Sequence, residues 1–325
     1  MKTLYWLVKR EFWEHRGGFL RAPAITAIAF LVIAIMTIAG GEIMGRHVGA
    51  RFPLDDKNLG VPASGIMDPQ TLQRVGTILD AILCGSALIV LAVMAIVVFF
   101  YCIGSLYDDR KDRSILFWES LPISNWKTVL SKVLSATVVA PVIATIIGVI
   151  FGLLLLALLI FTAIFHGFNV LHVLGAAHPI QVTVHIIALI PLYALCALPT
   201  IGWLMLCSAC ARSMPFLWAL VIPLASNVII WWLDLIGLAQ FNAGWYFSHI
   251  TARLLFGLRP ANWLDFSHNM PGTATDSLDH VTTLDRLGLI SNYASLGARD
   301  VWIGLIAGIA MLTAAIWVRR WRHDN

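Results

Sequence analysis

Long apolar runs constrain the fold of this chain more than any other feature of its sequence. A helix needs about 20 predominantly apolar residues to cross the hydrocarbon core of a bilayer, and an α-helix satisfies its own backbone groups there. Six runs approach or exceed that length, at about residues 22–40, 77–104, 128–165, 184–206, 216–238 and 299–318. The sequence therefore predicts an all-α integral membrane protein with six transmembrane helices, forming one domain over residues 1–325.

The composition excludes several other classes of protein. Hydrophobic residues make up 59% of the 325 residues and charged residues 12%, whereas a soluble domain has roughly 45–50% apolar and 25% charged residues. The net charge is only +4, and the basic residues sit beside the apolar runs, so we expect a lipid bilayer and no nucleic acid as a partner. Cys207 and Cys210 form a lone C-x-x-C, which small residues at a helix end explain better than a redox or metal role.

The distribution of Lys and Arg predicts the orientation in the membrane. With six spans both termini share one side, and most of the 22 Lys and Arg then fall on that side. Because cytoplasmic segments carry the excess of basic residues, we expect both termini in the cytoplasm and the chain in a bacterial inner membrane. Seven spans would put the basic tail, residues 319–322, outside. The regions 41–76 and 239–298 are then extracytoplasmic.

Residues 1–21 are predicted to form an amphipathic helix in the membrane interface. Apolar side chains recur on one helical face, and basic residues and two tryptophans surround that face. The apolar residues of this face are Leu4, Tyr5, Val8, Phe12 and Phe19. A secretory signal peptide is the competing interpretation, but the charged region is too long for one and no small-residue cleavage site follows the apolar run.

The segment 107–124 is the densest group of charges between the apolar runs. Asp108, Asp109 and Asp112 precede Ser114 and the apolar residues 115–118, so acidic groups lie where a short helix would begin. Pro122 ends that helix, and Ser124 can cap the next one. Its exposed apolar residues would favour a protein partner. An ordinary cytoplasmic loop, whose basic residues only set topology, is the alternative.

Residues 101–124, followed by 128–132, resemble the first cytoplasmic loop of the ABC type-2 transporter permeases. Residues 9–20 resemble the opening of the same family. The resemblance implies that residues 104–127 form a coupling loop, whose helix inserts apolar side chains into a groove on a separate ATPase subunit and places polar ones at the rim. The residues implied in this contact are Asp109, Arg110, Asp112, Arg113, Ile115, Leu116, Phe117, Trp118 and Glu119.

The resemblance also implies an exporter built from two permeases, identical or related, and two ATPase subunits. No G-x-x-x-x-G-K-S/T motif occurs in the chain, so we expect a non-catalytic subunit without cofactors, with ATP and Mg²⁺ bound by the partner ATPase. The spans lack charged residues near their middles, which favours amphipathic or hydrophobic cargo of unspecified identity over an ion-coupled transporter. Candidate residues of a cargo path in the fifth span are Trp218, Asn227, Trp231 and Trp232.

Two alternatives belong to other functional classes. One is a membrane-embedded enzyme that uses acidic and histidine residues of the outer region, although no H-E-x-x-H or nucleophile motif supports it. These residues are His249, Asp265, His268, Asp276, Asp279 and His280. The other is a permease-like subunit that senses or scaffolds without transporting.

Titratable residues near the outer span ends are also expected to be structural. His166, His172, His178 and His185 are favoured as interfacial residues over a metal site. Asp80 and Asp234 are favoured as hydrated positions at the mouths of spans.

Overall fold

The computed structural model describes residues 2–48, 69–111, 124–165, 175, 177–237, 242–262 and 288–321. These residues form helices and connecting turns, without a β-strand among them. Six helical segments of the described chain are long and apolar enough to cross a membrane. They are α2 (Ala22–Val48), α3 (Pro69–Ser105), α6 to α7 (Asn125–Leu134, η3 Ser135–Val139, Ala140–Phe165), α9 to α10 (Pro179–Ala188, Ile190–Cys210), α11 (Pro215–Leu235) and α17 (Arg299–Trp321). The described residues thereby confirm an all-α fold with six helices suited to cross a membrane.

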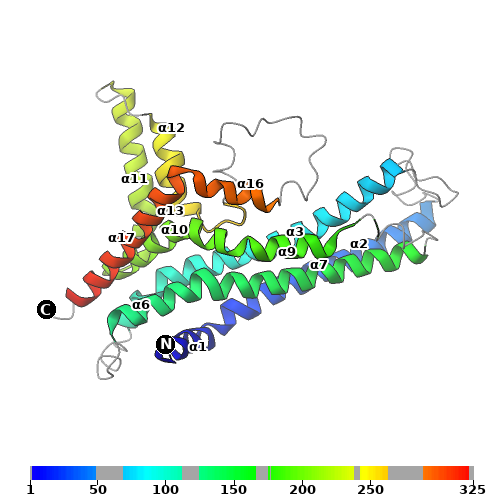
Figure 1. Ribbon diagram of the computed structural model, residues 1–325, viewed down its shortest axis with the longest axis horizontal. Helices are drawn as coiled ribbons and strands as arrows, with labels where there is room; N and C mark the ends of the chain where they lie inside the picture. The colour runs from blue at the N-terminus through cyan, green and yellow to red at the C-terminus, as the bar shows by residue number, and fades with distance from the viewer. Residues whose placement is uncertain are drawn as a thin grey trace.

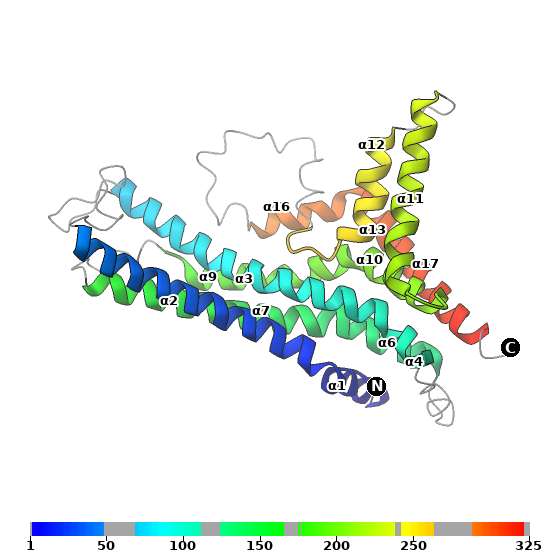
Figure 2. The same cartoon turned by 180° about the vertical axis from the view of Figure 1, so that it is seen from behind.

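The spans form two groups that meet at α10 (Figures 1 and 2). The helices α2, α3, α7 and α9 run side by side along the longest axis, whereas α11 diverges from them. Helix α10 contacts α3, α11 and α17, and its buried residues Leu192, Ile201 and Leu204 lie in the main hydrophobic core. The N- and C-termini lie at the same end of the molecule, as an even number of spans requires.

Glycines allow α10 and α17 to pack backbone against backbone. A Cβ atom at Gly202 would lie 2.6 Å from the carbonyl oxygen of Gly308, and one at Gly308 would lie 2.9 Å from the carbonyl oxygen of Leu198. Small residues permit such close approach in membranes, where van der Waals packing replaces the hydrophobic drive between helices. The two helices therefore form a close-packed pair.

Prolines account for the interruptions within the third and fourth spans. The third span was predicted at 128–165 with a kink at Pro141, and the helix is interrupted by η3, a π-helical stretch that ends just before Ala140. Proline has no N–H to give to the preceding turn, and a π segment rearranges the hydrogen bonds around the gap. The fourth span begins earlier than the predicted 184–206, and it breaks at Leu189, two residues before Pro191.

Part of the region 239–298 returns alongside the spans. Helices α12 (Ala243–Tyr246), η4 (Phe247–Thr251) and α13 (Ala252–Phe256) pack against α11 and α10. The Tyr246 hydroxyl donates to Ser226 Oγ, and the Thr200 hydroxyl donates to the carbonyl of Arg253. Ser226 and Thr200 lie well inside α11 and α10. Hydropathy gave no indication of this return, because the segment is short and mixed in polarity.

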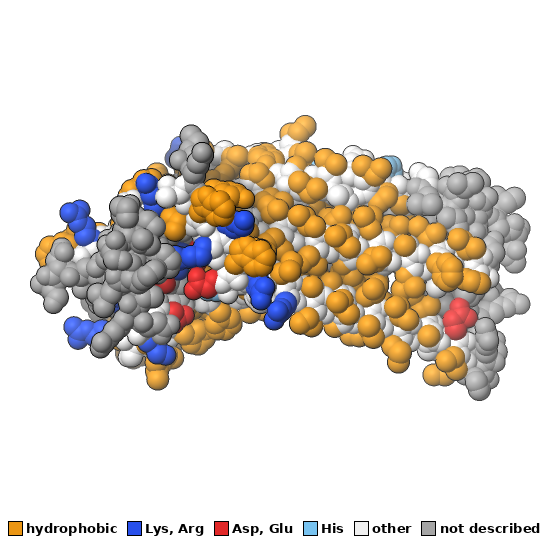
Figure 3. Space-filling model, turned by 90° about the horizontal axis from the view of Figure 1, so that it is seen from below, with side chains coloured by type: hydrophobic (Ala, Val, Ile, Leu, Met, Phe, Trp, Pro, Cys, Tyr) orange, Lys and Arg blue, Asp and Glu red, His pale blue; other side chains and the backbone are white. Residues whose placement is uncertain are grey.

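The outer faces of the spans are apolar. Hydrophobic side chains cover the side of the molecule seen in Figure 3, whereas Lys, Arg, Asp and Glu side chains gather towards the end that holds the termini. Exposed residues on α2 include Ile25, Ile33 and Met36, and those on α11 include Val228 and Ile229. Such surfaces suit lipid tails or the span of another membrane protein.

Candidate functional site

A buried carboxylate lies at the centre of the polar end of the molecule. Glu11 on α1 (Lys2–Glu14) has a side chain that is 0% exposed, one helical turn from the buried Leu7. Its Oε2 atom accepts a hydrogen bond of 3.0 Å from the hydroxyl of Tyr101 on α3. Its Oε1 atom lies 3.3 Å from Lys132 Nζ on α6 and 2.9 Å from Arg10 Nη2. Glu11 thus joins α1 to two other helices.

The surroundings of Glu11 keep its carboxylate charged. Burial alone would raise its pKa, but the positive charges of Lys132 and Arg10, the hydrogen bond from Tyr101 and the nearby His15 together lower the pKa below its ordinary value of 4.5. A charged group inside a protein is tolerated when such partners compensate it.

The same lysine continues the network towards the predicted coupling loop. Lys132 Nζ lies 3.5 Å from Asp109 Oδ1 on α4 (Tyr107–Lys111), and Arg319 Nη1 on α17 lies 3.6 Å from Asp109 Oδ2. Asp109 and Arg319 are largely withdrawn from solvent, and the Lys132 side chain is only 3% exposed. We call Glu11, Lys132, Asp109 and Arg319 the ionic cluster, which connects α1, α6, α4 and α17.

A second set of contacts ties α4 to the end of α10. The buried hydroxyl oxygen of Ser208 accepts hydrogen bonds from the backbone N–H groups of Leu106 and Tyr107, at 3.1 and 3.0 Å. Arg110 Nη2 donates to the carbonyl oxygens of Ser208 and Ala211. The residues that lead into the loop are therefore held by α10 as well as by the ionic cluster.

Only the first two predicted ATPase-contacting residues, Asp109 and Arg110, are described, and both have partners within this chain. The other seven lie outside the described residues, and their role stays a prediction. They are Asp112, Arg113, Ile115, Leu116, Phe117, Trp118 and Glu119.

The predicted cargo-path residues lie along α11, away from the ionic cluster. Trp218, Trp231 and Trp232 are each more than half exposed. Asn227 is partly buried, and its Oδ1 atom has no hydrogen-bond partner among the described residues. A path at these positions would need a second surface facing α11.

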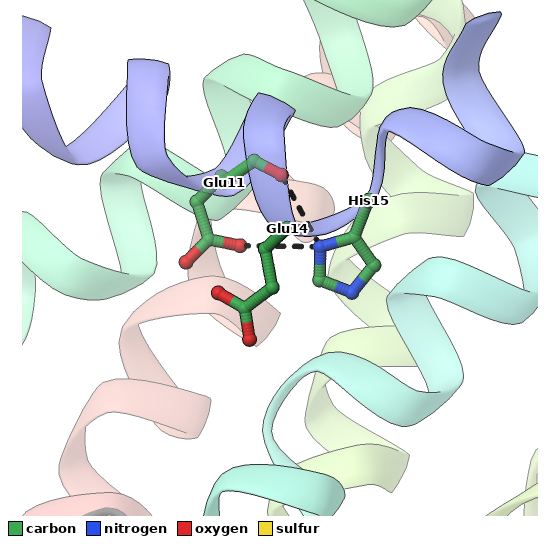
Figure 4. A group of neighbouring side chains, drawn as sticks. All are labelled: Glu11, Glu14 and His15. Atoms are coloured by element: carbon green, nitrogen blue, oxygen red, sulfur yellow. Dashed lines mark hydrogen bonds and ion pairs between the residues drawn. The ribbon is translucent and has the colours of Figure 1, made fainter.

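Glu11 also belongs to a group whose atoms come close enough to hold a metal ion, with Glu14 and His15 (Figure 4). His15 Nδ1 lies 3.3 Å from the carbonyl oxygen of Glu11 and 4.0 Å from its Oε2 atom. The Glu14 side chain is 58% exposed. Lys132 and Arg10 already compensate the charge of Glu11. We therefore interpret Glu11, Glu14 and His15 as part of the ionic cluster and its surroundings, and not as a metal-binding site.

The expectation of a hydrated Asp80 is wrong. This side chain on α3 is buried and accepts a 2.9 Å hydrogen bond from the backbone N–H of His178, the residue that precedes α9. It thus fixes His178, the N-cap residue of α9, from a different helix. Asp234 is exposed, as expected. His166 and His172 lie outside the described residues.

Most of the residues on which the enzyme alternative rests lie outside the described part of the chain. Of its six candidates only His249 is described; its ring stacks on Trp245, and its Nε2 atom lies 3.8 Å from Asp300 Oδ2. The remaining five are Asp265, His268, Asp276, Asp279 and His280. Cys207 is buried and Cys210 is exposed, both as free thiols.

Sequence analysis missed three members of the ionic cluster, Glu11, Lys132 and Arg319. One signal was available for Glu11, because it follows Leu4 and Leu7 at helical spacing and so lies on a face that is otherwise apolar. Lys132 and Arg319 were used only to predict topology, since their positions near span ends suit that role equally well.

In comparisons with protein-family models, curated proteins and solved structures, nothing matches this chain.

Proposed function

We propose that this chain is the transmembrane permease subunit of an ATP-driven ABC exporter in a bacterial inner membrane. Both termini face the cytoplasm, and a separate subunit binds ATP and Mg²⁺ and hydrolyses the nucleotide. The proposal is supported by the likeness of residues 9–20 and 101–132 to the ABC type-2 permeases and by six helices suited to cross a membrane.

The observation that carries the proposal is that ion pairs and hydrogen bonds within this chain hold Asp109 and Arg110, which lead into segment 112–123. Each buried ion costs several kcal/mol unless it is well paired, so a loop that only crosses the membrane surface has no need of buried charges at its base. Here Asp109 is held by Lys132 and Arg319, and Arg110 by the end of α10. A displacement of segment 112–123 would therefore be passed to α1, α6, α10 and α17 together.

In this proposal one part of the loop contacts the ATPase and another part is anchored to the spans. Apolar residues at 115–118 enter a groove of the ATPase, and Arg113 and Glu119 contact its rim. Asp109 and Arg110 anchor the loop to the spans. Because α10 and α17 pack backbone against backbone at Gly202 and Gly308, these two helices move as a pair when the anchor moves.

A second permease, identical or related, completes the complex. Cyclic two-fold symmetry is the commonest closed arrangement of subunits, and the outward faces of α2 and α11 are apolar and exposed. Amphipathic or hydrophobic cargo would pass between the two copies, near Trp218, Asn227, Trp231 and Trp232.

The test is a pull-down of the ATPase with loop variants. Truncating a packed aromatic anchor at an interface typically costs about 2 kcal/mol or more, which corresponds to a roughly 30-fold loss of affinity. Phe117→Ala or Trp118→Ala should therefore weaken ATPase association while the spans insert normally. Asp109→Ala should weaken association less. Unaltered association and unaltered coupling of hydrolysis in both aromatic variants would remove the basis of the proposal.

A further inference from the structure

Helix α1 has a second face, opposite the buried one, on which tryptophans alternate with cations. Trp6 and Trp13 are 60% and 55% exposed. Lys9 Nζ lies 4.9 Å from the ring centroid of Trp6, and Arg16 Cζ lies 5.8 Å from that of Trp13. The spacing of these four residues, at 6, 9, 13 and 16, puts them on one side of a helix.

Helix α6, which packs against α1, contributes a third pair of the same kind. Trp126 is exposed, and Lys127 Nζ lies 5.7 Å from its ring centroid. We use the name Trp–cation face for these pairs on two neighbouring helical segments: Trp6, Lys9, Trp13 and Arg16 at the start of the chain, and Trp126 and Lys127 at the start of α6. The exposed acid nearest in sequence, Glu14, lies off this stripe and 3.7 Å from Arg10.

The Trp–cation face lies next to the start of the first span in the chain. Helix α1 leads through η1 (Gly17–Arg21) directly into the first span. After Arg21, which is still exposed, the exposed side chains of the first span are mostly apolar, for example Ile25, Ile28 and Ile33. Figure 3 shows Lys and Arg side chains beside the border of the hydrophobic surface.

We propose that the Trp–cation face is a docking surface for anionic phospholipid head groups. The indole rings of Trp6, Trp13 and Trp126 would sit at the interface, where amphipathic aromatic rings are enriched. The cations of Lys9, Arg16 and Lys127, held over those rings, would contact the phosphodiester groups. Tryptophan and arginine are common in protein interfaces as well, so the preference for lipid over a protein partner rests on Lys9 and Lys127, because lysine is depleted from such interfaces.

The experiment is native mass spectrometry of the purified full chain in an uncharged detergent, titrated with phosphatidylglycerol or phosphatidylcholine. Each basic residue near an anionic surface is worth roughly fivefold in affinity, so three are worth on the order of 100-fold before screening. Wild-type protein should bind phosphatidylglycerol at least about tenfold more tightly than phosphatidylcholine, and added salt should reduce the preference.

The test variant is Lys9→Gln/Arg16→Gln/Lys127→Gln, and the matched control is Arg74→Gln/Arg212→Gln/Arg299→Gln, which removes the same charge from exposed positions elsewhere. Thermal unfolding should be alike in both. The test variant should lose most of the preference, and the control should keep it. An equal preference in wild type and test variant would overturn the proposal. So would loss of a co-purifying protein without loss of lipid preference, which would make the face a protein interface. The assay contains no ATPase, so its outcome is independent of the proposed function.

Discussion

Replacing Lys132 by methionine should destabilise the protein strongly, because it removes the cation shared by the buried Glu11 and the largely buried Asp109. Lys132 Nζ lies 3.3 Å from Glu11 and 3.5 Å from Asp109, and the side chains of Lys132 and Glu11 are almost fully buried. In the Lys132→Met variant Glu11 keeps Arg10 and Tyr101, and Asp109 keeps Arg319.

The size of the effect follows from the charges that remain. Removing one partner of a buried ion pair costs about 3–5 kcal/mol, because the other charge stays buried. The remaining partners of both acids place the Lys132→Met variant near the lower limit, at about 3 kcal/mol. Glu14→Gln is the control, because Glu14 is 58% exposed and 3.7 Å from Arg10, and a surface pair of this kind is worth at most about 1 kcal/mol.

The measurement is reversible denaturant unfolding of detergent-solubilised protein, completed as a double-mutant cycle. The Glu11→Gln/Lys132→Met variant should recover part of the loss, with an interaction energy above about 1 kcal/mol, because the charge left on Glu11 is removed as well. If Lys132→Met costs no more than Glu14→Gln, or if the double variant is simply additive, the ionic cluster does not stabilise the fold as argued.

Three further predictions concern pH, packing and topology. The folded-state pKa of Glu11 is lowered from 4.5, so its charge contributes fully to the unfolding free energy above pH 4.5 and progressively less below it. The difference in unfolding free energy between wild type and Glu11→Gln should therefore shrink on acidification. A constant difference would count against a charged Glu11. Gly202→Ala should lower the unfolding free energy by about 1–3 kcal/mol, because the added methyl group overpacks against Gly308. Gly85→Ala, which has open space at its Cβ position, should lower it little. Equal unfolding temperatures of the two variants would contradict the close α10–α17 contact. In a cysteine-free background an impermeant reagent applied to intact cells should label a cysteine at position 276 and leave one at position 320 unlabelled. Labelling at position 320 would contradict the proposal that the C-terminus is cytoplasmic.

The spans could be predicted because length and apolarity alone decide them. The predicted second span, 77–104, lies within α3, which begins eight residues earlier, and the predicted third span, 128–165, lies within α6 to α7, which begin three residues earlier. The return of α12 to α13 could not be predicted, because it depends on polar partners, such as Ser226 for Tyr246, that lie on another helix. Asp80 was misjudged for the same reason, since its partner, the N–H of His178, is distant in sequence.

Of the four residues of the ionic cluster, sequence analysis singled out only Asp109. The charge density of residues 107–113 drew attention to Asp109 and Arg110, and the resemblance to the ABC type-2 permeases implied that both would contact a partner subunit. The structure gives them partners within the chain instead, on α6, α17 and α10. Charge patterns in sequence reveal which groups are ionised, whereas helix packing decides which of them meet.

The central claim is that this chain is driven by a separate ATPase through segment 112–123. The most direct measurement is affinity purification of the intact chain from its native membrane, followed by identification of co-purifying proteins and an assay of ATP hydrolysis. We expect a P-loop ATPase to co-purify and hydrolyse ATP, and Phe117→Ala or Trp118→Ala to reduce both its recovery and the hydrolysis. A chain that purifies stably without an ATPase, or recovers one equally well with both variants, would contradict the account.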